Sequence, residues 1–466
     1  MMPRPSSRLR RSGHALQPKN EGGRIMWGIS FVRNVRFVAT LWAIYFFCVF
    51  TFGRLEQWTR FIIWVGGGVV VLGTLFAKGL RRRDIPNEAL FIVAFLGWSF
   101  LGWMQARDLQ AYNSYFKLCF EMLMVVAFLG AIVRKNGSLN VFWWSFIATA
   151  IFNTVAPIME GSFSIGGEAE SVARTRGLLA NPNALAFLCF LGVLGALALI
   201  GDKRSSPGVK VVAIAGSVVA FWGLIAAGSR GGYLAFTLAI ILWPLMCVGS
   251  WKRRKWRSIF FVLATVVAMC YVSLWVQENT NLGKRVERAA AGEDGSANER
   301  HDLILVGLKI TKDHPLIGVG LGQFGLVSKT GVYAHNEWIE LLATTGIPGF
   351  LFFMSIYVSA WRRLKRTLKY THDPIIRYRI KFAMMTLIIL VVAGAVFRPN
   401  FLNVDTIFLI AMVVGISHWA EDTVMPKPAL KRHHFLSAKQ TSTAQYGRGG
   451  VSGIEKSRML DGKAFR

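Results

Sequence analysis

The sequence has few cysteines, and those it has are scattered. Cys48, Cys119, Cys189, Cys247 and Cys270 each lie within an apolar stretch, and no two of them form a close pair. This spacing excludes a disulfide framework and a cysteine-based metal site, so we interpret the five side chains as small buried hydrophobic groups. Acidic residues are also scarce, because 25 Asp and Glu stand against 54 Lys and Arg. The formal net charge is therefore +29, and the location of the positive charges decides what they mean.

Several familiar catalytic motifs are missing as well. No Ser-His-Asp set, phosphate-binding loop or pair of carboxylates stands out. Residues 320–325 match a dinucleotide-binding fingerprint, but no strand–helix unit surrounds them, and we favour a flexible glycine-rich turn that approaches the membrane face. His301 and His314 lack a third ligand at a suitable spacing. We therefore predict no metal ion, and we expect no cofactor.

Long apolar stretches are what the sequence has in abundance. Hydrophobic residues make up 53% of the chain and the mean hydropathy is +0.42, which is too apolar for an ordinary soluble protein. Short basic clusters separate these stretches, whose length is close to that needed to cross the hydrocarbon core. We predict an all-α polytopic membrane protein of about twelve transmembrane helices. The expected spans are about 37–53, 61–77, 89–105, 116–133, 141–158, 183–200, 210–227, 231–249, 258–276, 337–360, 382–397 and 401–419.

The basic residues predict the orientation of these spans. With the N-terminus in the cytoplasm, 39 of the 54 Lys and Arg fall on the cytoplasmic side, in clusters such as residues 81–83 and 252–255. We attribute this charge to topology and to contact with anionic lipids, and we predict no nucleic-acid binding. The expected organisation is a basic cytoplasmic tail at 1–36, a transmembrane domain at 37–420 and a basic disordered cytoplasmic tail at 421–466.

Two connections on the opposite side of the membrane are long. One covers residues 159–182, and the other covers 277–336 and is the only place for a sizeable structure outside the membrane. Within the second, Ser296-Ala-Asn-Glu299 fits a capping box, which predicts a helix that ends near Asp313.

One face of this predicted helix combines apolar residues with a cation. Leu303, Gly307 and Ile310 share that face with Arg300. A helix of this kind is typical of the membrane surface. We therefore expect it to lie there, with Arg300 near the lipid headgroups.

The helix that follows the long connection begins at a histidine. His335 and Asn336 precede two acidic residues, and Asn336 is a good helix N-cap. The positive end of the helix dipole disfavours the imidazolium form, so a neutral His335 beside the membrane is a candidate general base. A plain helix cap before a kinked span, with the break at residues 346–349, explains the same residues.

Arginines are predicted on the same side of the membrane as His335. Arg230 lies between two apolar helices, and Arg174 and Arg176 precede the Asn181-Pro-Asn183 segment that begins another span. An arginine at membrane depth is usually kept for a partner such as a lipid phosphate, and snorkelling at the interface is the ordinary alternative. Because arginines bind diphosphates through paired hydrogen bonds, a base and two such cations are sufficient to transfer a group from a lipid diphosphate to a hydroxyl.

Together these motifs resemble a known family, the bacterial O-antigen ligase and O-antigen polymerase (Wzy-like) superfamily. Its pattern is His, then Asn, Ser or Gln, nine residues, Gly, two residues, and then Gly, Thr or Tyr. Four family motifs occur here in order and on one predicted membrane side: Arg176-Gly177 with Asn181-Pro182-Asn183, Ser229-Arg230-Gly231-Gly232, Arg300 with His314-Pro315-Leu316-Ile317-Gly318-Val319-Gly320, and His335-Asn336 with Gly346 and Gly349. The resemblance covers about 170–400.

The resemblance implies a membrane glycosyltransferase that moves a glycan from undecaprenyl diphosphate to an acceptor hydroxyl. Its active site would lie on the periplasmic side of the bacterial inner membrane, and transfer would be independent of metal and invert the anomeric carbon. His335, supported by Asn336, would be the general base. Arg230 and Arg300 would hold the diphosphate, and Arg176 is a further candidate for that role.

The acceptor leaves alternatives open. A polymerase of exopolysaccharide or O-antigen adds the glycan to another lipid-linked repeat unit, and a ligase adds it to lipid A core; the motifs serve both, and we place the polymerase first. A lipid-linked glycan flippase is disfavoured by few midplane charges, by the lack of an internal repeat and by the large outside loop. The expected partners are the lipid-linked oligosaccharide, the acceptor glycan or lipid A core, and membrane lipids, with room for a chain-length regulator or an export protein.

Overall fold

The structure is a computed structural model that describes residues 34–52, 62–77, 80–136, 139–164, 175–179, 181–247, 255–291, 295–396 and 400–425. Within these ranges the chain forms helices and no strands, so the predicted all-α class is confirmed. Arg174 lies outside the described residues. So do most of the predicted tails at 1–36 and 421–466.

The helices follow one another with short connections, except between α7 and α8 and in the region before α15. In chain order they are α2 (Val35–Thr51), the π-helical turn η1 (Ile62–Gly66), α4 (Gly67–Phe76), the 3-10 turn η2 (Arg82–Asp84), α5 (Glu88–Leu101), the 3-10 turn η3 (Gly102–Gln105), α6 (Leu109–Asn136), α7 (Asn140–Met159), α8 (Pro182–Gly201), α9 (Pro207–Ala227), α10 (Arg230–Cys247), α11 (Lys255–Asn279), α12 (Asn281–Ala290), α13 (Gly295–Asp313), α14 (Phe324–Val327), α15 (Glu337–Tyr370), α16 (Pro374–Val396), the 3-10 turn η4 (Asn400–Leu402) and α17 (Val404–Val424).

Each predicted span falls on one of these helices. The helices differ in whether they are long and apolar enough to cross a membrane. Eight are long and apolar enough to cross a membrane: α5 with η3, α6, α7, α8, α9, α15, α16 and α17. Three shorter apolar helices occupy Val35–Thr51, Ile62–Phe76 and Arg230–Met246. The multi-pass membrane class is therefore confirmed, and the number of twelve spans stays a prediction.

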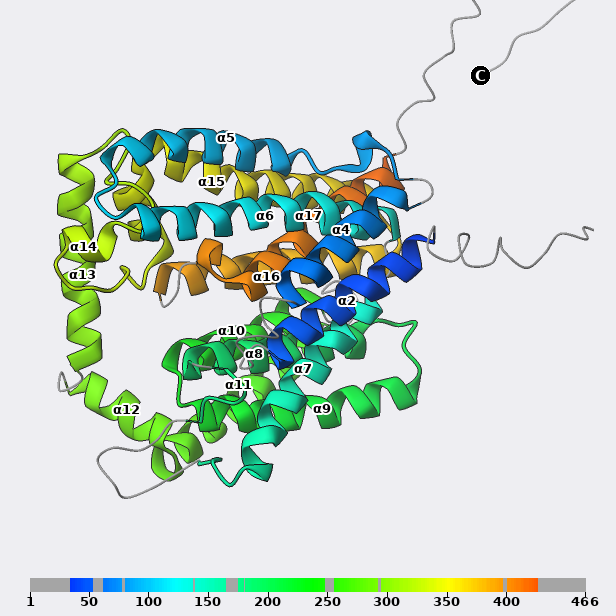
Figure 1. Cartoon of the computed structure of the whole chain (residues 1–466). Coiled ribbons are helices and arrows are strands. Elements are labelled where there is room, and N and C mark those ends of the chain that lie inside the picture. Colours follow the sequence, from blue (N-terminus) through cyan, green and yellow to red (C-terminus); the bar gives the residue numbers. More distant parts are fainter. Residues whose placement is uncertain are drawn as a thin grey trace, which may run out of the picture. The chain divides into compact units, whose positions relative to one another are not determined.

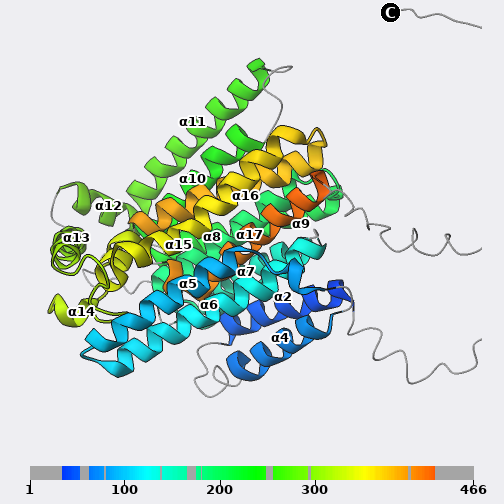
Figure 2. The ribbon, with the colours of Figure 1, turned by 90° about the horizontal axis from the view of Figure 1, so that it is seen from above.

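Two helices form the centre of the bundle. In α8 every residue from 185 to 199 is buried, and in α17 every residue from 405 to 418 is buried. A helix that is apolar on all sides must be surrounded by other helices. Accordingly, α8 packs against α7 and α9, and α17 packs against α6 and α15. Figure 2 shows α11 at one edge of this bundle, beyond α10, with α2 and α4 at the opposite edge.

The peripheral helices expose apolar side chains, as expected of surfaces that face lipid. Phe260 and Leu263 of α11 are 73% and 59% exposed. Cys270 on the same helix is also exposed, so our prediction that every cysteine is buried is wrong there. Cys119 and Cys189 are buried and Cys48 is half-buried, whereas the side chain of Cys247 lies outside the described part of the chain.

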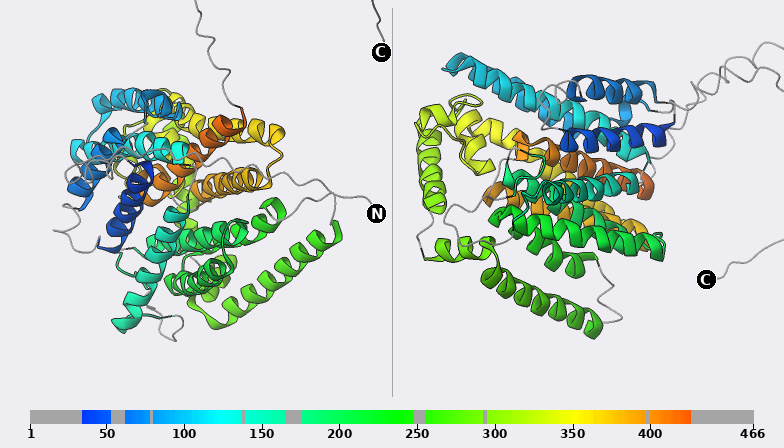
Figure 3. Two further views of the ribbon diagram at one scale, coloured as in Figure 1. Left: turned by 90° about the vertical axis from the view of Figure 1, so that its right-hand side faces the viewer. Right: turned by 60° about the horizontal axis from the view of Figure 1, so that its bottom comes forward.

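The bundle has two distinct ends. At the first, which we call the His335 end, α5, α7, α9 and α16 finish and α6, α8, α10, α15 and α17 begin. Figures 1 and 3 show α12 and α13 standing at this end, beyond the ends of the bundle helices. The opposite end, which we call the Arg363 end, carries the start of α5 and the last turns of α15 and α17. The connection that contains α12, α13 and α14 is therefore the main structure added to the bundle.

Candidate functional site

The start of α15 is fixed by its N-cap. The Oδ1 atom of Asn336 accepts hydrogen bonds from the backbone amides of Trp338, at 3.0 Å, and Ile339, at 3.2 Å. Its Nδ2 atom donates to the carbonyl of Ala395, in the last turn of α16. The predicted cap is confirmed, and the same side chain also ties the start of α15 to the end of α16.

His335 stands just before this cap in a strained backbone conformation. Its φ angle is +52°, in the left-handed region, which costs a residue with a Cβ about 1 kcal/mol or more. The preceding amide of Ala334 donates to Oε2 of Glu340 at 2.7 Å. The ring of His335 lies 4.1 Å from the ring of Tyr333, measured between centroids. The imidazole is therefore held in place by fixed neighbours on both sides.

The first part of α15 is separated from the rest of the helix by a break. Gly346 has φ +69° and ψ −178°, which only glycine adopts readily, and Pro348 follows two residues later without a backbone N–H. The break falls within the predicted interval of 346–349. The indole of Trp98 donates to the freed carbonyl of Thr345 at 3.1 Å. Residues 337–345 therefore form a short helix whose direction differs from that of the membrane span.

A turn at residues 315–320 supplies the other hydrogen bonds that the break requires. The amides of Val319 and Gly320 donate to the carbonyls of Ala343, at 2.9 Å, and Thr344, at 3.0 Å. Because Gly320 has φ +96° and lies against another helix, the turn needs glycine there. This turn approaches the backbone of α15 and holds the broken helix in position. That a glycine-rich turn at residues 320–325 approaches the membrane face stays a prediction.

Gln323 ties the same loop to the beginning of α6. The side chain is 1% exposed. Its Oε1 atom accepts from the backbone amides of Arg107 and Asp108, both at 2.9 Å, and its Nε2 atom donates to the Asp108 carbonyl at 2.8 Å. The loop after α13 is therefore anchored on two sides, to α15 and to α6.

The helix α13 packs on α15 and not on the membrane surface, so that expectation is wrong. Leu303 and Ile310 are buried in a small core that includes Phe324 and Ile339. A Cβ atom at Gly307 would lie 2.2 Å from the Ile339 side chain, so only glycine permits this approach. The apolar face that we assigned to lipid is therefore used for packing within the protein.

The boundaries of α13 agree with the prediction at one end only. The helix ends at Asp313 as expected, but it begins at Gly295, so Ser296 lies inside it and is not the N-cap. Arg300 is on the same face as Leu303, which is buried against α15. The packing of α13 therefore brings Arg300 toward the start of α15, where His335 lies.

The positive charge of Arg300 acts on His335, so the two side chains lie within electrostatic range of each other. Two effects lower the pKa of His335 from 6.5 to about 4. The larger is burial of the imidazole, and the smaller is the positive charge of Arg300. At neutral pH the imidazole is uncharged and has a free lone pair to accept a proton. The structure thus brings together two of the residues that the sequence nominates for the site.

Arg176 and Arg230 belong to a second cluster at the His335 end. The amide of Thr175 donates to the carbonyl of Ala226 at 3.2 Å, which holds the segment before α8 against the last turn of α9. Four residues later Arg230 begins α10, after a left-handed turn at Gly228 with φ +58°. Arg176 is exposed, and Arg230 is half-buried.

The two clusters are connected through α16. Helix α10, which begins at Arg230 in the second cluster, packs along α16. The last turn of α16 is in turn held by Asn336 through the Ala395 carbonyl. Both clusters therefore lie at one end of the bundle. That Arg176, Arg230, Arg300 and His335 contact one ligand stays a prediction.

Comparison with known proteins gives two matches, the first of which includes three of these residues. The O-Antigen ligase family model matches residues 215–354, which contain Arg230, Arg300 and His335 but not Arg176. The Exopolysaccharide production protein ExoQ of Rhizobium meliloti (strain 1021) is 27% identical over 224 residues, which cover 42% of this chain and 48% of that protein. Over residues 215–354 the chain is similar to the O-antigen ligase family. It spans about half the length of the curated relative that it matches.

Two structural roles near His335 were not predicted from the sequence. The carboxylate of Glu340 fixes Ala334, and Oε1 of Glu337 accepts from the amide of Phe401 at 3.1 Å. Both acids are visible in the first turn of α15, but their partners are set by tertiary contacts. Within the described part of the chain, no three His, Cys, Asp or Glu side chains are grouped so that they could hold a metal ion.

Proposed function

We propose that this protein is a membrane glycosyltransferase that moves a glycan from undecaprenyl diphosphate to an acceptor hydroxyl. The observation that carries the proposal is the proximity of an uncharged His335 to the guanidinium group of Arg300. An uncharged imidazole accepts a proton, and a guanidinium group binds a diphosphate. The match of residues 215–354 to the O-Antigen ligase family model supports the same assignment.

In the proposed reaction the acceptor oxygen attacks the anomeric carbon while the bond from that carbon to the diphosphate oxygen breaks. The diphosphate leaves with the electron pair, and the proton of the acceptor hydroxyl passes to His335. Attack from the face opposite the leaving group inverts the anomeric carbon. Arg300 and Arg230, with Arg176 as a further candidate, neutralise the departing diphosphate, which needs no acid to protonate it. In this scheme arginines provide the charge stabilisation, and no metal ion is required.

Binding of the donor would strengthen His335 as a base. In the free protein its pKa is about 4, so the imidazole is uncharged but only weakly basic. The negative charge of a bound diphosphate offsets the charge of Arg300 and favours the imidazolium form. The pKa therefore rises when the donor is bound, which is when a proton must be accepted.

The His335 end is proposed to face the periplasm, because most Lys and Arg fall on the connections at the other end. Accessibility of single cysteines tests this orientation. In a variant without the native cysteines, Lys309→Cys is on α13 and Lys203→Cys is in the connection between α8 and α9, and both positions are exposed. A membrane-impermeant maleimide added to intact spheroplasts should label position 309 and not 203. The reverse pattern would contradict the proposed orientation.

Polymerisation is our first choice for the acceptor step, and ligation is the second. The relative's printed name concerns exopolysaccharide production, which favours a polymerase, and the family description favours a ligase. Gel analysis of surface glycans in a deletion strain separates the two. Loss of long chains, with single repeat units still attached, indicates a polymerase. Loss of all attachment to lipid A core indicates a ligase, and unchanged glycans would contradict both.

A further inference from the structure

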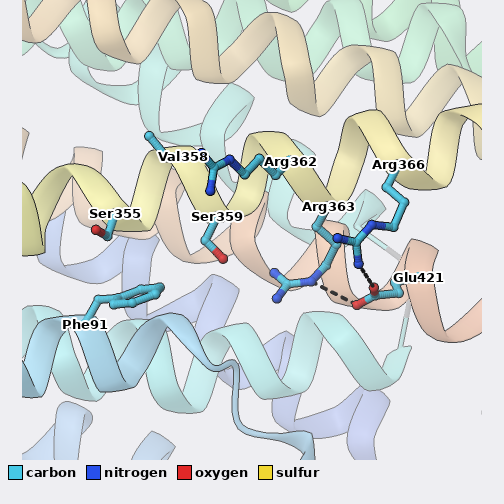
Figure 4. Close-up of a pocket in the computed structure, with 8 residues that line it drawn as sticks. All are labelled: Phe91, Ser355, Val358, Ser359, Arg362, Arg363, Arg366 and Glu421. Carbon is cyan, nitrogen blue, oxygen red and sulfur yellow. Dashed lines mark hydrogen bonds and ion pairs between the residues drawn. The ribbon is translucent and has the colours of Figure 1, made fainter.

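The Arg363 end of the bundle contains a cavity that is distant from His335. Arg362 lies 16 residues beyond the break at Gly346, which corresponds to about 24 Å along the continuous part of α15. The cavity has a volume of about 280 Å³, and α5, α15 and α17 contribute to its lining. Figure 4 shows its polar side, formed by Ser359, Arg362, Arg363, Arg366 and Glu421, with Phe91 opposite. It is therefore a second polar site, separate from the one proposed for glycan transfer.

One wall of this cavity is rigid. The Arg363 side chain is 11% exposed, and its Nε atom donates to Glu421 at 2.9 Å. Its Nη1 atom donates to Glu88, which is fully buried. Glu88 also accepts from Ser359 at 2.8 Å and lies 2.7 Å from Nε2 of His418. Because these bonds fix the carboxylates and Arg363 together, the wall needs no rearrangement when a ligand binds.

The charges around the cavity do not balance. Three arginines line it, and Glu88 and Glu421 are the carboxylates that neutralise them. The contact from Arg366 to Glu421 is 3.9 Å long, and the Arg366 side chain is 65% exposed, so that pair is weak. Arg362 is exposed and, among the described residues, makes no hydrogen bond or ion pair. An anion at the mouth of the cavity would supply the missing negative charge.

Arg362 stands at the level where lipid headgroups are expected. Residues 347–361 of α15 contain no charged side chain, so Arg362 is the first charge after an apolar stretch. Such a residue marks the membrane interface. In Figure 4 its side chain extends back along the helix toward Val358, which is toward the apolar stretch. An arginine directed that way is stabilised by an anionic partner within the membrane interface.

An apolar groove begins at the same arginine. The groove lies between α15 and α16, has a volume of about 340 Å³ and is lined by apolar side chains that include Met354, Trp361, Leu387 and Val391. Arg362 lines both the groove and the polar cavity. A cationic site and an apolar groove that meet at one residue match the two parts of a phospholipid. Basic sites between helices on the cytoplasmic side commonly bind anionic lipid headgroups.

We propose that this place binds one anionic phospholipid, with its phosphate on Arg362 and Arg366 and an acyl chain along the groove between α15 and α16. The lipid would join α5, α15, α16 and α17 at the Arg363 end. It would be a bound structural lipid and not a substrate, because the site lies near the opposite end of α15 from His335.

The test compares lipid retention by the full chain purified in dodecyl maltoside. Wild type is compared with Arg362→Gln/Arg366→Gln and with Arg204→Gln, an exposed arginine at the same end that does not line the cavity. Each protein is titrated with phosphatidylglycerol, with phosphatidylcholine of the same acyl chains, or with inorganic phosphate. Native mass spectrometry counts bound lipid, and thermal unfolding measures protection.

We expect wild type and Arg204→Gln to retain one phosphatidylglycerol, and the double variant to bind it about thirtyfold more weakly. Arg362→Gln alone, which leaves the buried network intact, should weaken binding about fivefold. Equal retention of phosphatidylglycerol by the double variant would overturn the proposal. So would equal binding of phosphatidylcholine, equal protection by inorganic phosphate alone, or a dimer that forms without bound lipid.

Discussion

The two ends of the bundle are built by different means. Among the described residues, every residue with a left-handed φ angle lies toward the His335 end, including His335 itself, Gly228, Gly320 and Gly346. These irregular turns place polar backbone groups and side chains outside the regular helices. Strained backbone of this kind is concentrated at ligand-binding sites, because ordinary packing does not require it.

The Arg363 end is held together by side chains. Arg134 pairs with Asp422 at 2.6 Å, and Arg379 pairs with Asp202 at 3.2 Å, each joining two different helices. The helices there begin and end without left-handed turns in the described residues. This end resembles an ordinary membrane interface, where ion pairs fix the helix ends.

The acidic residues show the difference most clearly. At the His335 end Glu340 accepts a hydrogen bond from a backbone amide, that of Ala334. At the Arg363 end Glu88 accepts from the guanidinium group of Arg363. Acids therefore fix the backbone around the imidazole at one end and neutralise a cation at the other. We infer that the His335 end is organised for a ligand and the Arg363 end for helix packing.

Replacement of His335 by alanine should have the largest effect on activity. Loss of a general base typically lowers the rate by about 10²–10⁴-fold, and the protein should remain in the membrane at its normal level. Glycan chain length on gels, with immunoblotting for abundance, measures both. His301→Ala, on the exposed side of α13, is the matched control and should retain activity. Normal chain lengths in His335→Ala would remove the catalytic assignment.

Replacement of Glu88 by glutamine should have the largest effect on stability. It removes the buried carboxylate that Arg363 and His418 share, although Arg363 keeps its ion pair with Glu421, and breaking such a buried pair costs about 3–5 kcal/mol in unfolding free energy. Thermal unfolding of the purified protein measures the loss. Glu121→Gln, which breaks the half-exposed pair with Lys117, should cost less than about 1 kcal/mol. Similar losses in the two variants would contradict the role given to the buried network.

Replacement of Arg300 by lysine should reduce activity about tenfold or more, because an ammonium group does not reproduce the planar, paired hydrogen bonds to a diphosphate. Rates of glycan extension in membranes measure this loss. Arg107→Lys provides the control, since that exposed side chain is at the same end of the bundle. Full activity in Arg300→Lys would reduce the role of Arg300 to a nonspecific positive charge.

The charge of Arg300 should also be visible in the titration of His335. Arg300→Gln should raise the pKa of His335 from about 4, but not to 6.5, because burial is the larger cause of the depression. NMR of the protein labelled with ¹³C-histidine, assigned by the missing signal in His335→Ala, measures it. For wild type, protonation of His335 should not lower kcat/KM until the pH falls toward 4. An unchanged pKa in Arg300→Gln would place the two groups too far apart.

Removal of the N-caps at the two ends should have the smallest effects and should separate function from stability. Asn336→Ala and Asn34→Ala each delete a side chain that caps a helix, α15 and α2 respectively. Each should lower the unfolding free energy by about 1 kcal/mol. Only Asn336→Ala should also reduce glycan transfer, because it loosens the turn that holds His335. Equal activity in the two variants would argue against a positioning role for Asn336.

The sequence predicts local features well, because they depend on neighbouring residues. The cap at Asn336, the break at Gly346 and the start of α8 at Pro182 are all explained by residue types within one turn. Contacts between distant segments were not predictable in this way. The face of α13 was assigned to lipid, since a single sequence does not reveal that Ile339 packs against it.

Buried polar contacts were the least predictable. Glu88 and His418 are 330 residues apart, and neither has a neighbour in the sequence that indicates the pair. The contacts of Gln323 were equally hard to predict, because its side chain accepts hydrogen bonds from amides in a segment more than 200 residues away. The arginines of the site were nominated from the sequence motifs, and the structure adds that the charge of Arg300 acts on His335.

Transfer by the purified protein tests the central claim most directly. Full-length wild type and His335→Ala are reconstituted in liposomes with undecaprenyl-diphosphate-linked repeat units extracted from a strain that lacks this protein, and both glycan length and released undecaprenyl diphosphate are measured. Our account predicts that wild type lengthens or transfers the glycan and releases undecaprenyl diphosphate in equal amount, while His335→Ala does neither. Movement of the intact donor across the bilayer without release, or equal release by both proteins, would contradict it.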